Sequence, residues 1–214
     1  MNLITAWEVV KYSSAERDYP TMYICSLIPI KEPSLFRACL GMDFYKELLG
    51  DVNDFSGVTE YVDTVTYSVG DLVLNGGCVL RSLQDNNLGN LFADDFADWW
   101  VEADKFKKEC NNLLWNKYLR YYLAYEIFAL SLRSATYKAG AKGLVEMVDD
   151  PTGIISAKKV TFSDYKRELQ NLAQDILANM MDWISDSDCE FNIRVSGCGE
   201  KKCTTKKRGR VIWV

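Results

Sequence analysis

The sequence predicts a mainly α-helical protein, a helical bundle around one long helix with inserted β-hairpins and a C-terminal strand pair. Three observations predict this fold class. Apolar residues recur at helical spacing between 106 and 132, glycine-containing turns near 76 and 150 separate β-prone runs, and residues 210–214 run apolar as strands do. We expect N-terminal helices over 1–64, a β-rich insertion over 65–100, the long helix, a hairpin and a closing helix over 101–188, and C-terminal strands with a basic loop over 189–214.

The first segment predicts three short helices. Residues 5–12 form the first, with Trp7, Val10 and Leu3 facing inward. Prolines on either side confine the second to residues 22–28, because proline interrupts a helix interior. The third spans 33–50, since proline suits a first helical turn and glycine suits an exit.

The insertion predicts a β-hairpin followed by a helix start. Asn75-Gly76-Gly77 separates two β-prone runs in the manner of a tight turn. A polar loop over 84–90 follows, and the acidic stretch 91–100 suits a helix N-terminus, where exposed N–H groups carry partial positive charge. We expect the helix to continue without interruption from Trp100 to about Gly140.

Two apolar stripes follow this long helix. The first contains Phe106, Cys110, Leu114, Tyr118, Tyr121, Tyr125, Phe128 and Leu132, and the second contains Trp115, Leu119, Leu123, Ile127 and Leu130. They lie about 100° apart, so the apolar band is wider than a single surface helix needs. The pattern therefore predicts neighbours on both sides and favours a subunit of an assembly.

The remaining segments predict a second hairpin, a closing helix and two strands. Residues 144–148 and 154–156 flank a turn at 149–153, and a helix begins at Thr161 and runs antiparallel to the long one. Its buried stripe contains Phe162, Tyr165, Leu169, Leu172, Ile176, Met180 and Trp183. Residues 190–195 and 210–214 are the expected strands, and the apolar end of the chain requires a covering surface.

Composition favours a soluble, non-enzymatic protein made in a cytoplasm. The chain has 214 residues and 48% hydrophobic content, yet it contains no secretion signal and no apolar run of about 18 residues that would cross a membrane. It contains no histidine, which excludes Ser-His-Asp and Cys-His catalysis within the chain. Phosphate-binding loops are also missing, the nearest fragment being Gly140-Ala-Lys142-Gly143. We expect no enzyme activity and no cofactor.

Charge is distributed unevenly along the chain. The net charge is −5, but residues after 200 hold six bases and no acid, so residues 1–200 carry 19 − 30 = −11. An acidic body argues against tight nucleic-acid binding, which depends on phosphate neutralisation. The basic residues contact phosphates or an acidic partner in one interpretation, and keep a strand edge soluble in the other; they are Lys201, Lys202, Lys206, Lys207, Arg208 and Arg210.

Two acidic clusters are candidate metal or catalytic sites. Asp94, Asp98 and Glu102, with Asp95 and Asp104 nearby, share a face of the expected helix, but compensation of the helix dipole explains them more simply. A histidine-free metal-dependent hydrolase would need such carboxylates to converge in a pocket. Asp149-Asp150 fits a turn.

The cysteines predict thiols rather than a metal centre. Cys189, Cys198 and Cys203 lack metal-knuckle spacing, which favours free thiols over zinc. The other four cysteines lie in apolar patterns and are expected to act as small hydrophobic residues; they are Cys25, Cys39, Cys78 and Cys110.

Aromatic and apolar side chains are the candidate contacts between subunits. Buried tyrosine hydroxyls need a partner, which favours subunit contacts over a dry core, whereas the tryptophans near the expected helix start also fit a core. The candidates are Trp99, Trp100, Trp115, Tyr118, Tyr122, Tyr125, Ile212 and Trp213.

The insertion resembles the small chitin-binding-type carbohydrate module. The resemblance rests on Tyr67-x-x-Gly70-Asp71-x-Val73, Gly77 and a closing Trp99 or Trp100. It implies a three-stranded unit whose exposed aromatic side chains stack on sugars. The sequence departs from the family on the second strand, where Val79-Leu80 replaces the aromatic residue. Sugar binding through the 65–100 insertion, which the resemblance implies, is the alternative function.

The whole layout is similar to the head-to-tail connector, or adaptor, proteins of tailed bacteriophages, most of all those of crAss-like phages of Bacteroides. The similarity includes the helix end between Gly41 and Gly50, Asn111-x-x-Leu114-Trp115-x-x-Tyr118-Leu119, and Gly140-Ala-Lys-Gly143-Leu144. It implies a homo-oligomeric ring of twelve copies at the head–tail junction of the virion. This ring would bind the portal protein and further tail or ring proteins and pass double-stranded DNA, without a membrane.

Overall fold

The protein is mainly helical, with a small three-stranded antiparallel sheet. The computed structural model describes residues 2–13, 15, 19–75, 77–89, 96–140, 143–146, 155–191, 193, 203–206 and 210–213, with backbone only for 96–97, 133–140, 143–146, 155–163, 203–206 and 210–213. The chain folds into two compact units: unit 1 contains Met1–Gly50 and Leu113–Val214, and unit 2 contains Asp51–Asn112. The β-rich part thus begins before and ends after the expected 65–100.

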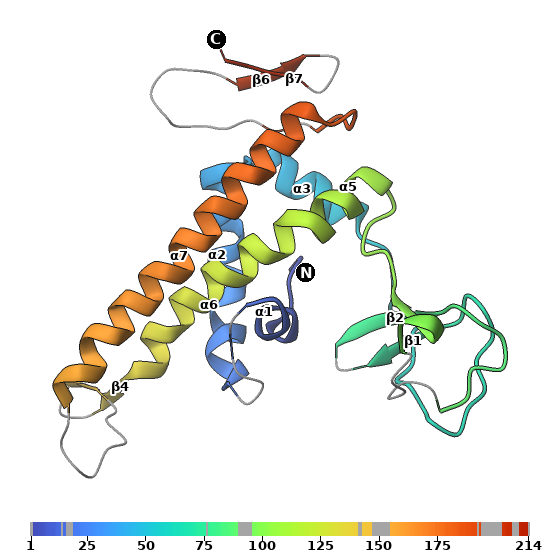
Figure 1. Cartoon of the computed structure of the whole chain (residues 1–214), viewed down its shortest axis with the longest axis horizontal. Coiled ribbons are helices and arrows are strands. Elements are labelled where there is room, and N and C mark those ends of the chain that lie inside the picture. Colours follow the sequence, from blue (N-terminus) through green and yellow to red (C-terminus); the bar gives the residue numbers. More distant parts are fainter. Residues whose placement is uncertain are drawn as a thin grey trace. The chain divides into compact units, whose positions relative to one another are not determined.

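Unit 1 is built around α6 (Arg120–Thr136), which packs against α1 (Ala6–Tyr12), α2 (Thr21–Cys39) and α7 (Ile155–Asp186) (Figure 1). Two pairs of contacts give the direction of α7. Gln174 bonds to Glu126, while Trp183 contacts Tyr118. A later residue of α7 therefore meets an earlier residue of the central helix, and the predicted antiparallel arrangement is confirmed.

Helix α1 starts where the sequence predicts. The Thr5 hydroxyl accepts from the Glu8 N–H and the Glu8 carboxylate accepts from the Thr5 N–H, which forms a capping box. The prediction of its inward face was partly wrong. Leu3 and Val9 are buried, whereas Trp7 is 37% exposed.

Helix α2 corrects the expected break at the prolines, because it continues through Pro29 and Pro33. Its buried stripe is Ile24, Ile28, Glu32 and Phe36, and the two prolines lie off that stripe. Each proline removes one backbone donor, and on a solvent-facing side water can satisfy the carbonyl left without it. The helix ends near Gly41, whose φ of 90° is accessible mainly to glycine, and α3 (Met42–Asp51) follows.

The central helical run starts later than predicted. Residues Trp100–Glu102 form strand β3, and the run begins with α5 (Glu109–Leu114) before the π-helix η2 (Trp115–Leu119) and α6. The side chain of Asn112 holds the turn that precedes α5. Its Oδ1 accepts from the Phe106 N–H and its Nδ2 donates to the Phe106 carbonyl, each at 2.7 Å. These bonds give Phe106 partners outside any helix.

Unit 2 contains an antiparallel sheet of β1 (Leu72–Asn75), β2 (Cys78–Ser82) and β3 (Trp100–Glu102), in that order. Asn75 pairs with Cys78, so the hairpin predicted at Asn75-Gly76-Gly77 is confirmed. A four-residue helix, α4 (Phe96–Trp99), precedes β3, and residues 91–95 of the expected helix start lie outside the described chain. The core of the unit is Tyr67, Val73, Cys78, Leu80 and Trp100, all buried.

The last two hairpins are formed by other segments than those predicted. Strand β4 (Tyr137–Gly140) pairs with β5 (Gly143–Glu146), whereas Ile155 and Ser156, expected in a strand, begin α7. At the C-terminus, β7 (Arg210–Trp213) pairs with β6 (Cys203–Lys206) rather than with residues 190–195. Glu190 and Phe191 lie outside any strand, and Asp149-Asp150 lies outside the described residues.

Candidate contact surfaces

Three of the predicted interface aromatics are covered by their own chain. Trp100 is 1% exposed and lies in the core of unit 2 against Tyr67. Trp115 and Tyr122 are buried in unit 1. These side chains offer no surface to a neighbouring copy, which corrects the interface prediction for them.

The other interface candidates are half-buried or have side chains outside the described residues. Trp99 packs against the core of unit 2, and Tyr118 contacts the ring of Trp183 with centroids 5.7 Å apart. Tyr125 is half-buried. The side chains of Ile212 and Trp213, and those of the six predicted basic contacts at 201, 202, 206, 207, 208 and 210, lie outside the described residues.

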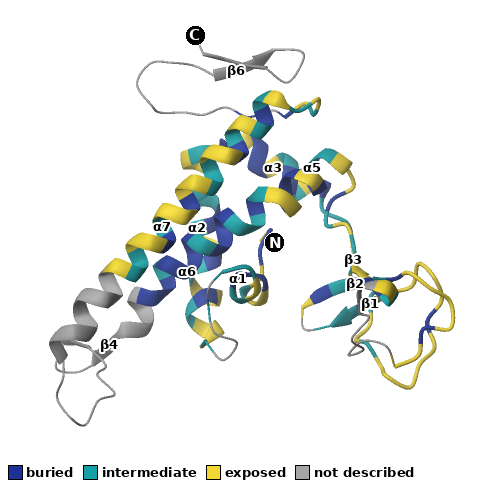
Figure 2. Cartoon of the chain, viewed as in Figure 1, coloured by how far each residue is buried: buried dark blue, intermediate teal, exposed yellow. Residues whose placement is uncertain are grey.

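The two apolar stripes of the long helix are also covered within the chain (Figure 2). Every stripe member is buried or half-buried. In unit 1 the cover comes from α1, α2 and α7, which pack against α6; Phe106 and Cys110 belong to unit 2. The argument that this helix requires neighbouring copies is therefore wrong. Within the first stripe, Tyr121 and Tyr125 are half-buried, whereas the neighbouring Tyr122 is buried.

Three helices meet at a polar cluster inside unit 1, made of Cys39, Tyr122, Glu126 and Gln174. The Cys39 Sγ lies 3.0 Å from the Tyr122 hydroxyl, and the Gln174 Nε2 donates to the Glu126 carboxylate at 3.2 Å. Burial is the main cause that raises the pKa of the Cys39 thiol, the Tyr122 hydroxyl and the Glu126 carboxyl. A thiol held protonated is a poor nucleophile, so the cluster fits helix positioning better than covalent chemistry.

The predicted acidic cluster does not assemble in the described part of the chain, and of the cysteine cluster Cys198 and the side chain of Cys203 lie outside that part. Asp98 lies in α4 and Glu102 in β3, so the carboxylates do not share one helical face, while Asp94 and Asp95 lie outside. Cys110 and Cys189 are disulfide-bonded, which corrects the expectation of thiols there. The described residues contain no group of three ligands arranged for a metal ion.

The sugar-binding alternative requires exposed aromatic rings in unit 2. Tyr61 and Tyr67 stack with ring centroids 5.5 Å apart, but both also contact Trp100 edge to face inside the unit. Among the unit 2 side chains that the structure describes, every aromatic one is buried or half-buried. These rings form a core and not a platform for a sugar.

Sequence reasoning missed an apolar surface on two loops of unit 2. The first loop is 62–69 and the second is 83–88. We call the surface the loop surface; its members are Val62, Val65, Val69, Leu83 and Leu88, which are 41–60% exposed. Backbone bonds hold the loops side by side: Tyr67 and Asn87 exchange both N–H···O bonds at 3.0 Å, and the Val69 N–H donates to Asp85 at 2.9 Å. The available signal was the spacing of three valines through a turn-rich stretch, which we did not use.

A second missed surface is the outer face of α2, opposite its buried stripe. Its exposed members are Met22, Ser26, Pro29, Ile30, Ser34, Arg37 and Ala38, so Arg37 is the only charged residue among them. Met22 and Ile30 are 70% and 63% exposed. The signal in the sequence was the small number of charged residues in 21–38, a stretch in which we predicted helix breaks at the prolines.

No described helix is both long enough and apolar enough to span a bilayer. The chain matches no family model, no curated protein and no solved structure at a significant level.

Proposed function

We propose that the chain is a structural virion protein, a subunit of a head-to-tail connector that forms a ring under the portal and lines the DNA passage to the tail. One observation carries the proposal. The chain presents two different apolar surfaces, the loop surface in unit 2 and the outer face of α2 in unit 1. Contiguous exposed apolar side chains on a protein surface commonly mark sites of association.

Two distinct surfaces suit a ring better than a symmetric dimer. A twofold dimer uses the same patch on both copies, whereas a ring subunit meets its two neighbours, or a neighbour and a partner ring, through different patches. The proposal does not depend on the central helix, because the apolar side chains of α6 are covered inside unit 1.

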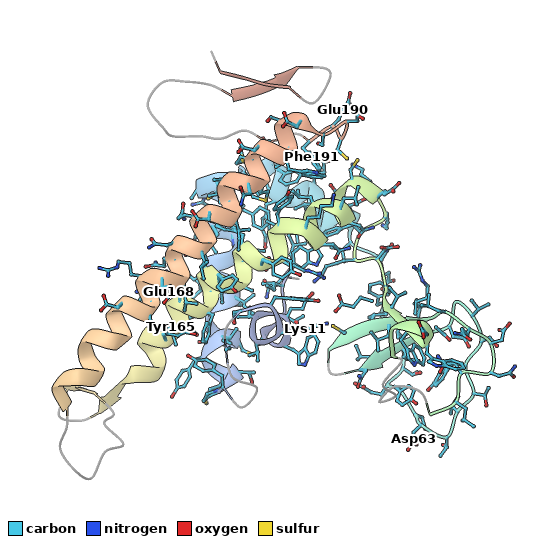
Figure 3. The ribbon with its side chains drawn as sticks, viewed as in Figure 1. Lys11, Asp63, Tyr165, Glu168, Glu190 and Phe191 are labelled. Atoms are coloured by element: carbon cyan, nitrogen blue, oxygen red, sulfur yellow. The ribbon has the colours of Figure 1, made fainter. Side chains whose placement is uncertain are left out.

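The exposed side of α7 and the residues just after it suit a passage for DNA. Between residues 164 and 190 the chain carries seven acids and two bases, so its net charge there is 2 − 7 = −5. The acids are Asp164, Glu168, Asp175, Asp182, Asp186, Asp188 and Glu190, all exposed; Glu168 and Glu190 are labelled in Figure 3. Such a wall repels phosphates, so DNA would move past it without being bound.

The test is the mass of the purified full-length chain in solution, alone and mixed with a cognate portal protein. We expect a closed ring whose mass is a whole-number multiple of 24.4 kDa, either for the chain alone or for the chain bound to the portal protein. A monodisperse monomer under both conditions would overturn the proposal.

A double substitution on the outer face of α2, Met22→Asp with Ile30→Asp, should reduce assembly. Leu172→Asp is the control. Leu172 was expected in the buried stripe of the closing helix, but it is 41% exposed on α7 and lies outside both surfaces. Equal loss of assembly in the control would show a general effect of added charge.

A further inference from the structure

We propose that the loop surface of unit 2 binds the basic C-terminal segment, residues 201–214, of a second copy of this chain, so that copies join head to tail. The inference deepens the proposed function, because it names the contact that would close the ring. It rests on the exposure, the hydrogen bonds and the charge of the loop surface and on the composition of the segment.

The loop surface is apolar and held in place before any partner arrives. Val69 and Leu88 are its most exposed members, at 60% and 51%. Besides the Tyr67–Asn87 bonds, the Ser68 N–H donates to Asp71 at 2.7 Å, and Gly89 lies near the Asp63 carbonyl on the first loop. A preorganised surface loses little conformational entropy on binding, which favours association.

The surroundings of the loop surface are acidic. Residues 59–89 contain Glu60, Asp63, Asp71 and Asp85 but one base, Arg81. Asp63, labelled in Figure 3, is exposed on the first loop. Unit 2 as a whole has four bases and twelve acids, a net charge of 4 − 12 = −8, whereas the rest of the chain carries 21 − 18 = +3.

The C-terminal segment matches this surface in both respects. Residues 201–214 contain six bases and no acid, and they end in Val211, Ile212, Trp213 and Val214. A basic segment with an apolar end complements an acidic rim around exposed aliphatic side chains. Its two strands, β6 and β7, form a two-stranded sheet, and β7 also contacts α7 of its own chain.

A second copy is the occupant that these observations favour. The two complementary features belong to different units of the same chain, the loop surface to unit 2 and the C-terminal segment to unit 1. Contact between unlike patches on identical copies is heterologous, and it produces a ring when the rotation between copies closes. The resulting assembly should also weaken as salt is added, because part of the attraction is between exposed charges.

The experiment uses two full-length variants with complementary defects. The first, Val69→Asp with Leu88→Asp, disables the loop surface; the second, Lys207→Glu with Arg208→Glu, disables the segment. Each alone should associate at least roughly 30-fold more weakly than the wild type, as expected for the loss of a hot-spot contact. Mixed together, they should form a dimer of about twice 24.4 kDa, because one intact loop surface meets one intact segment.

Native mass spectrometry measures each species, and circular dichroism with thermal unfolding checks that each variant remains folded. Leu172→Asp, the exposed control on α7, should assemble as the wild type does. A charge exchange gives an independent measure: Asp63→Lys weakens assembly, and combining it with Lys207→Glu and Arg208→Glu in the same chain restores it.

The outcomes separate this inference from the proposed function. If the loop-surface variant still forms full assemblies, or if the mixture stays monomeric while the wild type assembles, the inference fails and the connector proposal stands. If the wild type is monomeric both alone and with the portal protein, the connector proposal itself fails, and this inference fails with it.

Discussion

At the scale of single residues, Glu32 organises the start of the chain. It is fully buried, and its carboxylate accepts hydrogen bonds from the N–H groups of Leu3 and Ile4 at 2.9–3.0 Å and from the Tyr45 hydroxyl at 2.7 Å. Burial, followed by this bond to Glu32, raises the pKa of the Tyr45 hydroxyl, so it remains a donor at neutral pH. A buried carboxylate is tolerated here because its oxygens have partners.

We therefore expect Glu32→Ala to lower the free energy of unfolding by about 3–5 kcal/mol, because it leaves several buried donors without an acceptor. Tyr45→Phe removes one bond and should cost about 1 kcal/mol. Urea unfolding followed by tryptophan fluorescence measures both. Equal losses in the two variants would contradict the role given to the carboxylate.

Glu126 gives a prediction on pH. Burial raises the pKa of its carboxyl above the ordinary value of 4.5, so the folded chain holds a proton that the unfolded chain releases. Its contribution to stability is full below pH 4.5 and is lost as the pH rises through the folded pKa. Glu126→Gln should therefore be more stable than the wild type at neutral pH, by a margin that shrinks on acidification; thermal unfolding across pH measures it. A margin independent of pH would count against this account.

At the scale of elements, Asn112 explains why the central helical run starts at Glu109. It is largely buried, and its side chain bonds both backbone polar groups of Phe106. The carboxylate of Asp51 accepts from the Lys108 N–H at 3.1 Å and from the Asn111 side chain at 2.8 Å, which secures the same turn. Helical periodicity alone does not reveal such bonds, because they join residues through their side chains.

Asn112→Ala should lower the free energy of unfolding by about 2–3 kcal/mol, since it removes two buried bonds and leaves the Phe106 N–H unsatisfied. Asn116→Ala is the matched control. Asn116 is exposed and its Oδ1 accepts a bond from the Arg120 guanidinium at 3.1 Å, so its loss should cost less than about 0.5 kcal/mol. Chemical denaturation distinguishes the two, and a mild effect at Asn112 would show that the turn is held by other contacts.

At the scale of the whole molecule, each unit has its own hydrophobic core. Unit 2 buries Trp100 among Tyr67, Val73 and Leu80, and unit 1 buries Trp115 and the apolar side of α6. The indole Nε1 of Trp100 is buried and has no hydrogen-bond partner among the residues that the structure describes, so the ring contributes through packing.

Trp100→Ala should destabilise unit 2 by about 3–5 kcal/mol through the cavity it leaves. Hydrogen exchange followed by mass spectrometry should show protection lost within residues 51–112 and kept in α6 and α7. Trp115→Ala should give the reverse pattern. If both variants lose protection evenly along the chain, the units unfold together and the division does not describe stability.

Several elements were predictable from the sequence because their signals are local. The cap of α1 depends on residues three positions apart, and the β1–β2 turn on adjacent small residues. The direction of α7 followed from the periodicity of two long apolar segments. In each case the residues that carry the signal make the contact themselves.

Other features of the fold depend on contacts between residues that are far apart in the sequence. The stripes of the central helix were read correctly as apolar, yet their spacing did not show that α1, α2 and α7 of the same chain cover them. Strand β3 forms at Trp100 because β2 supplies its backbone partners, which overrides a helical pattern. The exposed loop surface likewise emerges only when residues 62–69 and 83–88 are brought together, because exposure is a property of packing and not of composition.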